Sequence, residues 1–367
     1  MADTRQQVNP RLQAITDQGT SIWLDQVQRD LVQEGELERM VREECLRGVT
    51  SNPAIFKEAI LGSELYDEQL TEAAKEGADA REIFRRIAVR DIQEACDVLR
   101  TVWDDSNGVD GYVSIEVDPD IANDTDKTIE QARELWGLVD RPNVMIKIPG
   151  TDAGLPAVET ALREGINVNI TLLFRVEQYD HVMERYIAAM QARHEAGESL
   201  DVHSVASFFV SRVDSLVDKQ LGDGHELRGK AGLANARNAY RHFQRTFGGG
   251  AFATLREAGC PVQRPLWAST GTKDPAYPDT LYVDGLLGPD TVNTMPLKTL
   301  QAAADHGEAP GATVLEDPAE DLEALEAAGI DMTAVTEQLL EEAIQKFVTP
   351  MEELLEAIEE QRKKALG

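Results

Sequence analysis

Asn143-Val144-Met145-Ile146-Lys147-Ile148-Pro149-Gly150 predicts one short buried strand, because proline residues bound an aliphatic run on both sides. The side chains of a strand alternate between two faces. Val144, Ile146 and Ile148 therefore share one face, while Lys147 lies on the other beside Met145. The strand thus places a single lysine opposite a wholly aliphatic face.

Lys147 admits two interpretations. If its face is enclosed, an ammonium without a partner is costly to bury and tends to lose its proton. A neutral lysine amine is a nucleophile that can attack a ketone and form a Schiff base. The alternative is a lysine whose stem lies along the strand while its amine reaches water. The strand alone leaves both interpretations open.

The composition is that of an acidic protein with enough hydrophobic residues for a large core. The chain has 367 residues, of which 42% are hydrophobic, and 66 acidic against 36 basic residues give a net charge of -30. Nucleic acids and anionic membranes need concentrated positive charge, so we expect neither as a partner. An anionic small substrate remains compatible, because charges beyond roughly 8 Å are screened at physiological salt.

Cysteine usage favours a reducing compartment. Cys45, Cys96 and Cys260 are far apart and odd in number, and they form no disulfide framework or CxxC metal pattern. Residues 1–20 are polar and lack the apolar core of a signal peptide, and no apolar run approaches the length of a membrane span. We therefore expect a cytoplasmic protein.

Short strand patterns alternate with helical patterns along most of the chain. Helical periodicity is clearest in residues 80–103, 126–138, 152–163 and 176–195. Strands are expected at residues 21–25, at a segment ending in 48–53, and at 111–118, 143–150, 166–174, 202–210, 264–270 and 291–295. This rhythm predicts an α/β protein with a (β/α)8 TIM barrel. A doubly wound sheet is the alternative, but Asp25-Gln26-Val27 is not the glycine-rich turn that such a sheet carries after its first strand.

We expect one domain over residues 1–367, with the barrel at about residues 20–310 and additional C-terminal helices at about 317–366. The C-terminal segment is rich in Glu, Leu and Ala at helical spacing, and Pro350 predicts a break in it. Its last helix is expected to pack on the outside, with its acidic residues forming a solvated face.

Polar residues gather on one face of the predicted strands, opposite the aliphatic stripe. On residues 166–174, Val168, Ile170 and Leu172 are expected on one face and Asn167, Asn169 and Thr171 on the other. Thr50 shares its strand face with Asn52. The convergent late-strand residues are Asp25, Asn52, Glu116, Lys147, Asn169, Thr171 and Ser207.

Each of these residues has a structural explanation when it is taken alone. Asp25 and Asn52 are common in loops, Thr171 is an ordinary strand residue, and Glu116 suits a solvated edge. Their convergence favours a site, because active sites of these barrels lie at the C-terminal ends of the strands.

Three chemistries compete for this site. Asp25, Asp118 and Asp120 could hold a hard cation, but they form no tight ligand cluster, and we expect no metal or other cofactor. A serine hydrolase lacks its strand-end GxSxG motif. Lys147 with flanking carboxylates fits Schiff-base carbon–carbon chemistry better.

Four further segments accompany the strand of Lys147: Gly48-Val49-Thr50-Ser51-Asn52-Pro53, Ile115-Glu116-Val117-Asp118, Asn169-Ile170-Thr171-Leu172-Leu173-Phe174 and Ser207-Phe208-Phe209-Val210-Ser211-Arg212. In this order they resemble segments of the transaldolase family, and the Lys147 segment is similar to the Schiff-base segment of that family. The resemblance covers about residues 20 to 350. The resemblance implies a class I aldolase barrel in the non-oxidative pentose phosphate pathway. The implied reaction moves a dihydroxyacetone unit from sedoheptulose 7-phosphate to glyceraldehyde 3-phosphate, giving erythrose 4-phosphate and fructose 6-phosphate.

The resemblance also implies roles for individual residues. Lys147 resembles the nucleophile, Asp25 the acid/base for the C4 hydroxyl, and Glu116 with Thr171 the pair that holds a catalytic water. Substrate hydroxyls would be bound by Asn52 and Asn169 with support from Thr50 and Ser207, next to Phe209, and the phosphate by Arg212.

One segment departs from the family pattern. Many relatives carry an arginine in an Ala-Ser-x-Arg context after strand seven, whereas this chain has Ala268-Ser269-Thr270-Gly271-Thr272-Lys273. Lys273 is the candidate substitute, and an ammonium pairs with phosphate as a point charge without the guanidinium fork.

Two other functions remain open as alternatives, with small-molecule sugar phosphates as partners in each case. One is a barrel that only binds sugar phosphates. The other is a simple aldolase that releases free dihydroxyacetone, whose known representatives tend to carry glutamine and tyrosine where this chain has Glu116 and Phe209. The sequence leaves the oligomeric state open between monomer and homodimer.

Overall fold

The strands close into a barrel in the computed structural model, which describes residues 8–366. Each strand pairs in parallel with its neighbour in the sequence, and β8 pairs with β1. The predicted (β/α)8 barrel is confirmed. Its strands are β1 (Thr20–Leu24), β2 (Leu46–Val49), β3 (Tyr112–Glu116), β4 (Val144–Pro149), β5 (Val168–Leu173), β6 (Ser204–Phe209), β7 (Arg264–Ala268) and β8 (Thr291–Met295).

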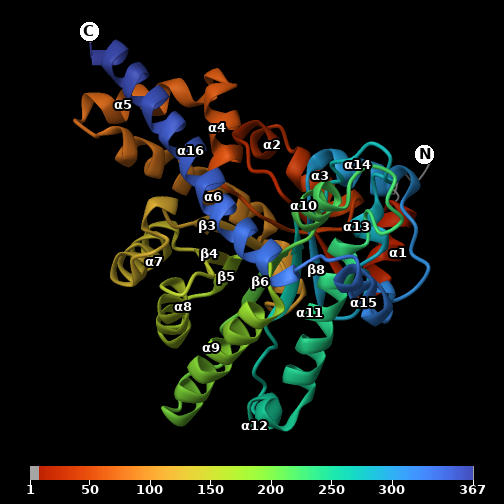
Figure 1. Ribbon diagram of the computed structural model, residues 1–367. Helices are drawn as coiled ribbons and strands as arrows, with labels where there is room; N and C mark the ends of the chain where they lie inside the picture. Colours follow the sequence, from red (N-terminus) through yellow and green to blue (C-terminus); the bar gives the residue numbers. More distant parts are fainter. Residues whose placement is uncertain (1–7, 367) are drawn as a thin grey trace, which may run out of the picture.

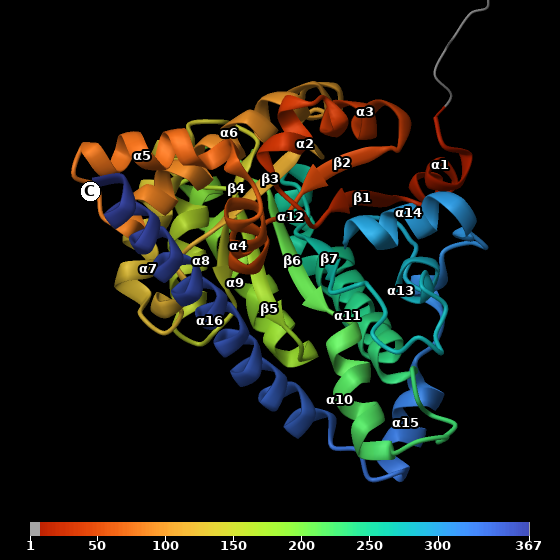
Figure 2. The same cartoon turned by 90° about the horizontal axis from the view of Figure 1, so that it is seen from above.

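Helices surround the barrel in the order of the strands that they follow, as Figures 1 and 2 show from two directions. The helix α1 (Pro10–Asp17) precedes β1. The others up to β8 are α2 (Arg29–Gln33), α3 (Glu36–Glu43), α4 (Pro53–Leu61), α5 (Asp67–Lys75), α6 (Ala80–Asp105), α7 (Thr125–Val139), α8 (Gly154–Arg163), α9 (Val176–Glu195), α10 (Ser211–Leu221), α11 (Ala231–Gly248), α12 (Ala253–Glu257) and α13 (Leu281–Asp284). The helix α14 (Leu297–His306) follows β8, and 3-10 turns lie at η1 (Glu64–Tyr66), η2 (Pro119–Ile121), η3 (Gly250–Phe252) and η4 (Thr313–Leu315).

Several helices begin at a side chain that accepts a hydrogen bond from a free backbone N–H of the first turn. Asn52 caps α4, and Pro53 follows it at the first helical position. Asp79 caps α6, and Asp124 caps α7. Such a cap contributes about 1 kcal/mol to helix stability. The cap at Asn52 also holds the segment after β2 in place at the mouth of the barrel.

The hydrophobic core forms two layers, one between strands and helices and one inside the barrel. The inner layer includes Trp23, Met145 and Phe209. The outer layer contains the aliphatic face predicted from strand phase: Ile22, Leu24, Ile115, Val117, Val144, Ile146, Ile148, Val168, Ile170, Ala206, Phe208 and Val210. Each buried Val, Leu, Ile or Phe side chain contributes about 1.5–3 kcal/mol. The strand phase is therefore enforced by the helices that cover the outer face.

Leu172 breaks the alternation of β5. Its φ is 62°, and the register between β5 and β6 shifts between Ile170 and Leu173. Leu172 packs with the inner layer and Leu173 with the outer layer. The prediction that Leu172 continues the outer stripe is therefore wrong, because the extra residue of a bulge reverses the side-chain order.

The C-terminal segment forms α15 (Ala319–Ala327) and α16 (Met332–Leu366). The predicted break near Pro350 is wrong, since α16 continues through it. The break lies instead at Gly329, whose φ is 85°. A proline inside a helix costs about 3 kcal/mol. Burial of Phe347 and Met351, on either side of Pro350, offsets that cost.

The course of α16 differs from that of an ordinary outer helix. Its C-terminal part packs on α4, α5 and α6, as expected for a helix on the outside (Figures 1 and 2). It also contacts α10 and β5, and so crosses the end of the barrel where the strands terminate. The second contact brings the C-terminal segment next to the predicted site.

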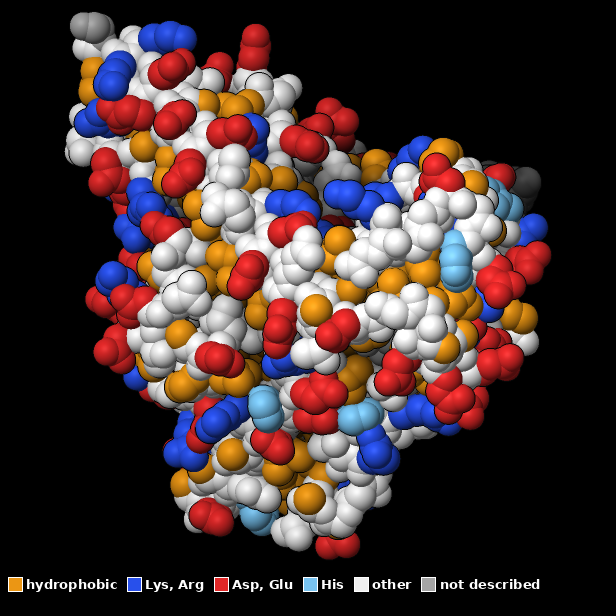
Figure 3. All heavy atoms as spheres, viewed as in Figure 1, with side chains coloured by type: hydrophobic (Ala, Val, Ile, Leu, Met, Phe, Trp, Pro, Cys, Tyr) orange, Lys and Arg blue, Asp and Glu red, His pale blue; other side chains and the backbone are white. Residues whose placement is uncertain are grey.

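The surface carries acidic side chains over the whole face seen in Figure 3, interspersed with basic ones. Many of them form ion pairs within a helix, such as Arg86 with Glu82 on α6. Among residues 8–366, no helix combines the length and the apolar character needed to cross a bilayer.

Candidate active site

Lys147 lies late in β4 and is only 4% exposed. In the sheet it pairs with Glu116 of β3 on one side and with Asn169 of β5 on the other. Its Nζ donates a 3.0 Å hydrogen bond to the carbonyl oxygen of Ser51 and lies 3.5 Å from Glu116 Oε2. Lys147 is therefore enclosed by its neighbours, and its amine does not extend into bulk water.

Glu116 supplies a carboxyl group next to the lysine. Its Oε2 is buried and accepts no hydrogen bond from any residue in the range 8–366. Burial raises the pKa of Glu116 from 4.5 to about 7, although the adjacent charge of Lys147 acts in the opposite direction. A carboxyl group that titrates near neutral pH can both donate and accept a proton during catalysis.

Asp25 follows β1 directly and is held by two threonines. The Thr50 hydroxyl donates a 2.7 Å hydrogen bond to Asp25 Oδ1, and Thr294 Oγ1 lies 2.7 Å from Thr50 Oγ1. Because Thr50 uses its hydrogen on Asp25, Thr294 is the donor of the second bond. These bonds orient the carboxylate while its other oxygen stays available.

Thr294 was not among the site residues expected from the sequence. Strand alternation on β8 places it on the inner side together with Val292, which packs in the inner layer. The same phase argument that found Asp25 and Glu116 would have found Thr294 if it had been applied to the eighth strand. The signal was present in the sequence.

Asn169 is fixed by a chain of short hydrogen bonds across three strands. Ser207 Oγ donates to Asn169 Oδ1 at 2.7 Å, and Asn169 Nδ2 donates to Ser114 Oγ at 3.0 Å. All three residues are buried. The chain sets the orientation of the Asn169 amide and leaves one of its N–H groups for another partner.

Asn52 and Thr171 differ in whether their side-chain oxygens have a hydrogen-bond partner. Asn52 Oδ1 accepts a 3.1 Å hydrogen bond from the backbone N–H of Ile55, so the structural explanation of Asn52 holds for that oxygen. Thr171 pairs with Pro149 across the sheet, and its buried Oγ1 has no hydrogen-bond partner among residues 8–366. A buried hydroxyl without a partner is costly, and such groups concentrate at functional sites.

Two basic residues lie on the segments that follow β6 and β7. The Arg212 guanidinium carbon lies 5.1 Å from the centre of the Phe209 ring, and Arg212 Nη1 is buried without a hydrogen bond to any described residue. Burial lowers the pKa of Arg212. Partial burial, and then the nearby charge of Arg212, lower the pKa of Lys273. The two cations therefore face the same space and repel each other.

A pocket of about 200 Å³ connects these groups. Of the predicted residues it is lined by Asp25, Thr50, Asn52, Lys147, Ser207, Phe209, Arg212 and Lys273. Glu116, Asn169 and Thr171 do not line it. Glu116 nevertheless reaches Lys147, and Asn169 binds Ser207, so both support residues that do. The pocket therefore brings the Asp25 carboxylate and the Lys147 amine together with two further basic side chains, Arg212 and Lys273.

Phe347 of α16 also lines the pocket, and Lys147 Nζ lies 5.8 Å from the centre of its ring. The sequence analysis missed this residue. Its spacing along α16 is that of any buried helix position, and nothing local distinguishes it from Leu354 or Ile358, which pack in the outer layer. Only the course of α16 across the mouth brings Phe347 to Lys147.

The aspartates considered as metal ligands are engaged elsewhere. Arg81 Nη1 donates to Asp118 at 2.5 Å, and Arg81 Nη2 donates to Asp120 at 2.9 Å. Asp25 lies apart from them in the pocket with Lys147. Among residues 8–366, no three His, Cys, Asp or Glu side chains are grouped as metal ligands.

Known proteins resemble this chain over almost its whole length. The family model described as Transaldolase/Fructose-6-phosphate aldolase matches residues 22–358. A protein from Mycolicibacterium paratuberculosis named Transaldolase is 50% identical, covering 96% of this chain and 97% of that protein. Proteins of the same name from Mycolicibacterium smegmatis and Mycobacterium tuberculosis are each 49% identical, covering 96% and 95% of this chain and 98% and 96% of their own. The resemblance seen in the motifs is confirmed, and the chain belongs to the transaldolase/fructose-6-phosphate aldolase family.

Proposed function

We propose that this protein is a transaldolase, which transfers a dihydroxyacetone unit from sedoheptulose 7-phosphate to glyceraldehyde 3-phosphate through a Schiff base on Lys147. The observation that carries the proposal is an enclosed lysine amine 3.5 Å from the carboxyl group of Glu116, whose pKa is about 7. The same pocket is lined by Arg212 and Lys273, which suit the phosphate of the donor. Such an enzyme belongs to the non-oxidative pentose phosphate pathway.

Schiff-base formation begins when the neutral Lys147 amine attacks the C2 carbonyl of the donor. The carbonyl electron pair moves to oxygen, and a proton is transferred from nitrogen to give a carbinolamine. Glu116, with a water held between it and Thr171, then gives a proton to the departing hydroxyl. Water leaves, and an iminium remains on Lys147. The free polar atoms of Glu116 and Thr171 support this assignment.

Cleavage of the C3–C4 bond is assigned to Asp25. Its carboxylate removes the proton of the C4 hydroxyl, the C4 aldehyde departs, and the bonding electron pair moves into the iminium to form an enamine. The bonds from Thr50 and through it from Thr294 keep Asp25 oriented for this step. The acceptor aldehyde then adds to the enamine by the reverse sequence.

Hydroxyl groups of the bound substrate are assigned to the amides. Asn169 presents an amide N–H that Ser207 and Ser114 have oriented, and Asn52 presents its Nδ2 group because its oxygen caps α4. Preorganised donors of this kind stabilise a developing charge without reorganising during the reaction.

Transfer without release requires that water does not protonate the enamine. Phe209 lines the pocket and packs against Phe174, with ring centres 5.1 Å apart. Phe347 approaches Lys147 from α16. We assign to Phe209 the exclusion of water near the enamine carbon. A hydroxyl at that position would instead add a group able to deliver a proton.

The direct test is borohydride reduction with fructose 6-phosphate, followed by peptide mapping. Reduction of the iminium should attach the sugar to the peptide that contains Lys147. A modification at Lys57, Lys127 or Lys273 instead would contradict the assignment. Exposed Lys127, with 66% of its side chain accessible, serves as an internal control for non-specific reaction.

The setting proposed for this activity is a single cytoplasmic domain. The contacts of α16 with α4, α6, α10 and β5 tie the C-terminal helices to the barrel and support one folding unit over residues 8–366 of the domain proposed for residues 1–367. Cys45, Cys96 and Cys260 are buried as free thiols, which suits a reducing compartment. Separate unfolding transitions for barrel and tail in calorimetry would contradict the single domain.

A further inference from the structure

The loop after β7, residues 269–280, carries Lys273 and is tied at several points to α10, the helix that carries Arg212. We propose that Tyr277 and Asp218 position Lys273, so that α10 presents both phosphate-binding cations as one unit. The inference rests on the proposed function, since it requires that Arg212 and Lys273 bind the phosphate of the substrate.

The first tie joins the start of the loop to the start of the helix. The backbone N–H of Ser211 donates to the Ser269 carbonyl oxygen at 3.0 Å, and their hydroxyl oxygens lie 2.9 Å apart. Ser269 has a φ of 57°, so the chain turns sharply there. Arg212 is the next residue along the helix, and the loop therefore leaves β7 beside it.

The second tie lies beyond Lys273. Tyr277 donates its hydroxyl hydrogen to Asp218 Oδ2 at 2.6 Å, while Asp218 Oδ1 accepts a 2.9 Å bond from the backbone N–H of Gly229. Asp218 is only 5% exposed. One turn earlier on α10, Asp214 accepts a 2.7 Å bond from the hydroxyl of Tyr282, just after the loop. Two buried carboxylates of α10 thus bind the distal end of the loop.

The third tie is adjacent to Lys273 itself. Arg228 Nη2 donates to Asp274 Oδ2 at 2.9 Å, and Arg228 Nη1 donates to the carbonyl oxygen of Asp218 at 3.0 Å. Asp274 is the residue after Lys273. The position of the Lys273 backbone is therefore determined by Asp218 through Tyr277 on one path and through Arg228 on another.

Lys273 needs such support because its surroundings favour movement of its side chain away from Arg212 and the pocket. It lies in a loop between β7 and α13, and it faces the charge of Arg212. The charge of Asp25 favours its charged form. A lysine that binds phosphate as a point charge gains nothing from fork geometry, so its distance from the phosphate decides its contribution. Ordering the loop beforehand removes that entropic cost from binding.

The test compares Tyr277→Phe with Tyr240→Phe. Tyr240 donates one hydrogen bond to the Pro289 carbonyl oxygen at 3.0 Å and does not line the pocket. With fructose 6-phosphate as donor, Tyr277→Phe should raise KM roughly two- to tenfold, the range expected for one lost hydrogen bond. Its kcat should stay unchanged, as should kcat and KM with unphosphorylated fructose. Inorganic phosphate should inhibit it less strongly by the same factor. Tyr240→Phe should show none of these changes.

A double variant separates positioning from general destabilisation. If Tyr277 acts through Lys273, then combining Tyr277→Phe with Lys273→Ala should raise KM no further than Lys273→Ala alone. Additive effects, an unchanged KM in Tyr277→Phe, or equal losses with both donors would each overturn the inference. Arg212→Ala shows whether a negative result contradicts only the positioning role of Tyr277 or also the proposed phosphate binding. If it raises KM for fructose 6-phosphate while Tyr277→Phe does not, only the positioning role is overturned. If neither variant responds to the phosphate, the proposed phosphate binding is overturned as well.

Discussion

The two ends of the barrel both bury acidic and basic side chains, but they differ in how far the polar atoms of these side chains are hydrogen-bonded. At the C-terminal end, Glu116 Oε2 and Arg212 Nη1 are buried polar atoms without a hydrogen bond to any described residue. At the N-terminal end, Arg264 and Asp110 are also buried, at 8% and 9% exposure, but they bind each other at 2.9 Å. At the C-terminal mouth these two polar atoms thus remain available for a ligand, whereas at the N-terminal floor Arg264 and Asp110 bind each other.

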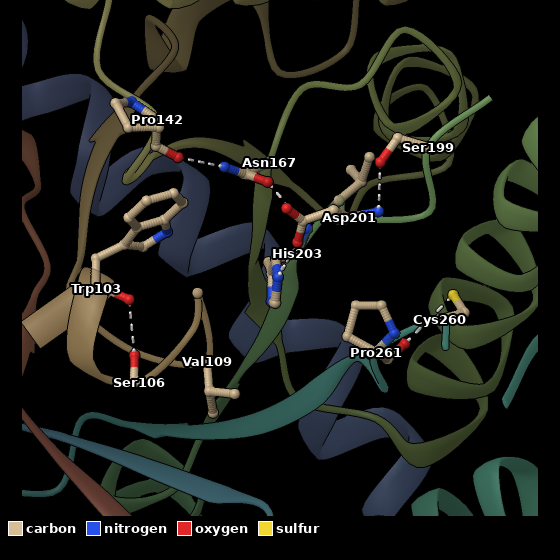
Figure 4. A network of polar contacts seen from close by, with 12 residues as sticks. Trp103, Ser106, Val109, Pro142, Asn167, Ser199, Asp201, His203, Cys260 and Pro261 are labelled. Carbon is tan, nitrogen blue, oxygen red and sulfur yellow. Dashed lines mark hydrogen bonds and ion pairs between the residues drawn. The ribbon is translucent and has the colours of Figure 1, made fainter. Parts of the chain in front are cut away.

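The floor is a compact network around one ion pair. Ser21 donates to Asp110 at 2.6 Å and accepts from Arg264 at 2.9 Å, while Trp23 Nε1 donates to Asp110 at 3.2 Å. Figure 4 shows neighbouring contacts, in which Asp201 binds the His203 ring and Asn167 lies close by. Removing one partner of such a pair is costly, because the other charge is then left buried without compensation.

Asn167 and Asn169 illustrate the difference within one strand region. Both lie on the same side by alternation, yet Asn167 Nδ2 donates to the Pro142 carbonyl oxygen at 3.0 Å and its Oδ1 accepts from the backbone N–H of His203 at 2.9 Å. Asn169, two residues later, joins Ser207 beside Lys147. Alternation identifies the inner face, and depth along the strand separates support from chemistry.

The largest expected effect is at the mouth. Lys147→Ala should fold normally and lose transfer by about 10⁴-fold or more, because no other group can form the iminium. Steady-state assays and thermal melting measure the two properties. Lys127→Ala, a change at an exposed lysine, is the control. A substantial residual rate would mean that Lys147 at the mouth is not the lysine that forms the iminium.

Glu116→Gln should lower kcat by roughly 10²- to 10⁴-fold, the usual range for a lost acid/base group. Because the folded-state pKa of Glu116 is raised from 4.5 to about 7, the contribution of this group to stability is lost as pH rises from about 4.5 through 7. The variant should lack that loss and gain in relative stability over this window. Urea unfolding at pH 5 and pH 8 measures it, with exposed Glu130→Gln as control. If the free energy of unfolding depends on pH in the same way in wild type and variant, the raised pKa of Glu116 is contradicted.

Asp110→Ala should act in the opposite way. It leaves Arg264 buried without its charge partner, so the free energy of unfolding should fall by about 3–5 kcal/mol while kcat of the folded enzyme is retained. Asp97→Ala breaks an exposed pair with Arg141 and should cost under about 1 kcal/mol. A loss of kcat in the folded Asp110→Ala enzyme would show that the floor is coupled to the chemistry.

Arg212→Ala should raise KM for fructose 6-phosphate about ten- to hundredfold, the equivalent of about 1.5–3 kcal/mol for a charge-assisted contact. The effect with unphosphorylated fructose should be much smaller. Arg133→Ala, at an exposed pair with Glu164, is the matched control. Equal effects on both donors would indicate that Arg212 supports the fold in the manner of Arg264.

The smallest effect is expected from Phe209→Tyr. The added hydroxyl should raise the ratio of dihydroxyacetone release to transfer by at most about tenfold, or about 1.4 kcal/mol in relative barriers. The ratio is measured with fructose 6-phosphate in the presence and absence of an acceptor aldose. An unchanged ratio in an active variant would make Phe209 a packing residue and leave Phe347 as the side chain that protects the enamine.

Alternation and spacing predict most of the barrel and much of the mouth. Strand bounds at 291–295 and helix bounds at 176–195 agree with β8 and α9, because strong periodicity and flanking residues define them locally. The places of Lys147, Glu116 and Asn169 on adjacent strands follow from the same alternation. The prediction failed at Leu172, where a bulge that no local pattern announces reverses the order.

The sequence by itself determined the barrel, its inner face and the identity of the lysine that faces inward, because a period of two residues and the burial of aliphatic groups are local properties. Only the tertiary structure decided that Phe347 reaches Lys147 and that the Lys273 loop is bound to α10. Those contacts join segments far apart in the chain, and their partners depend on how complete elements pack. Helical spacing specifies that Phe347 is buried. The path of α16 across the mouth of the barrel decides that Phe347 lies next to Lys147.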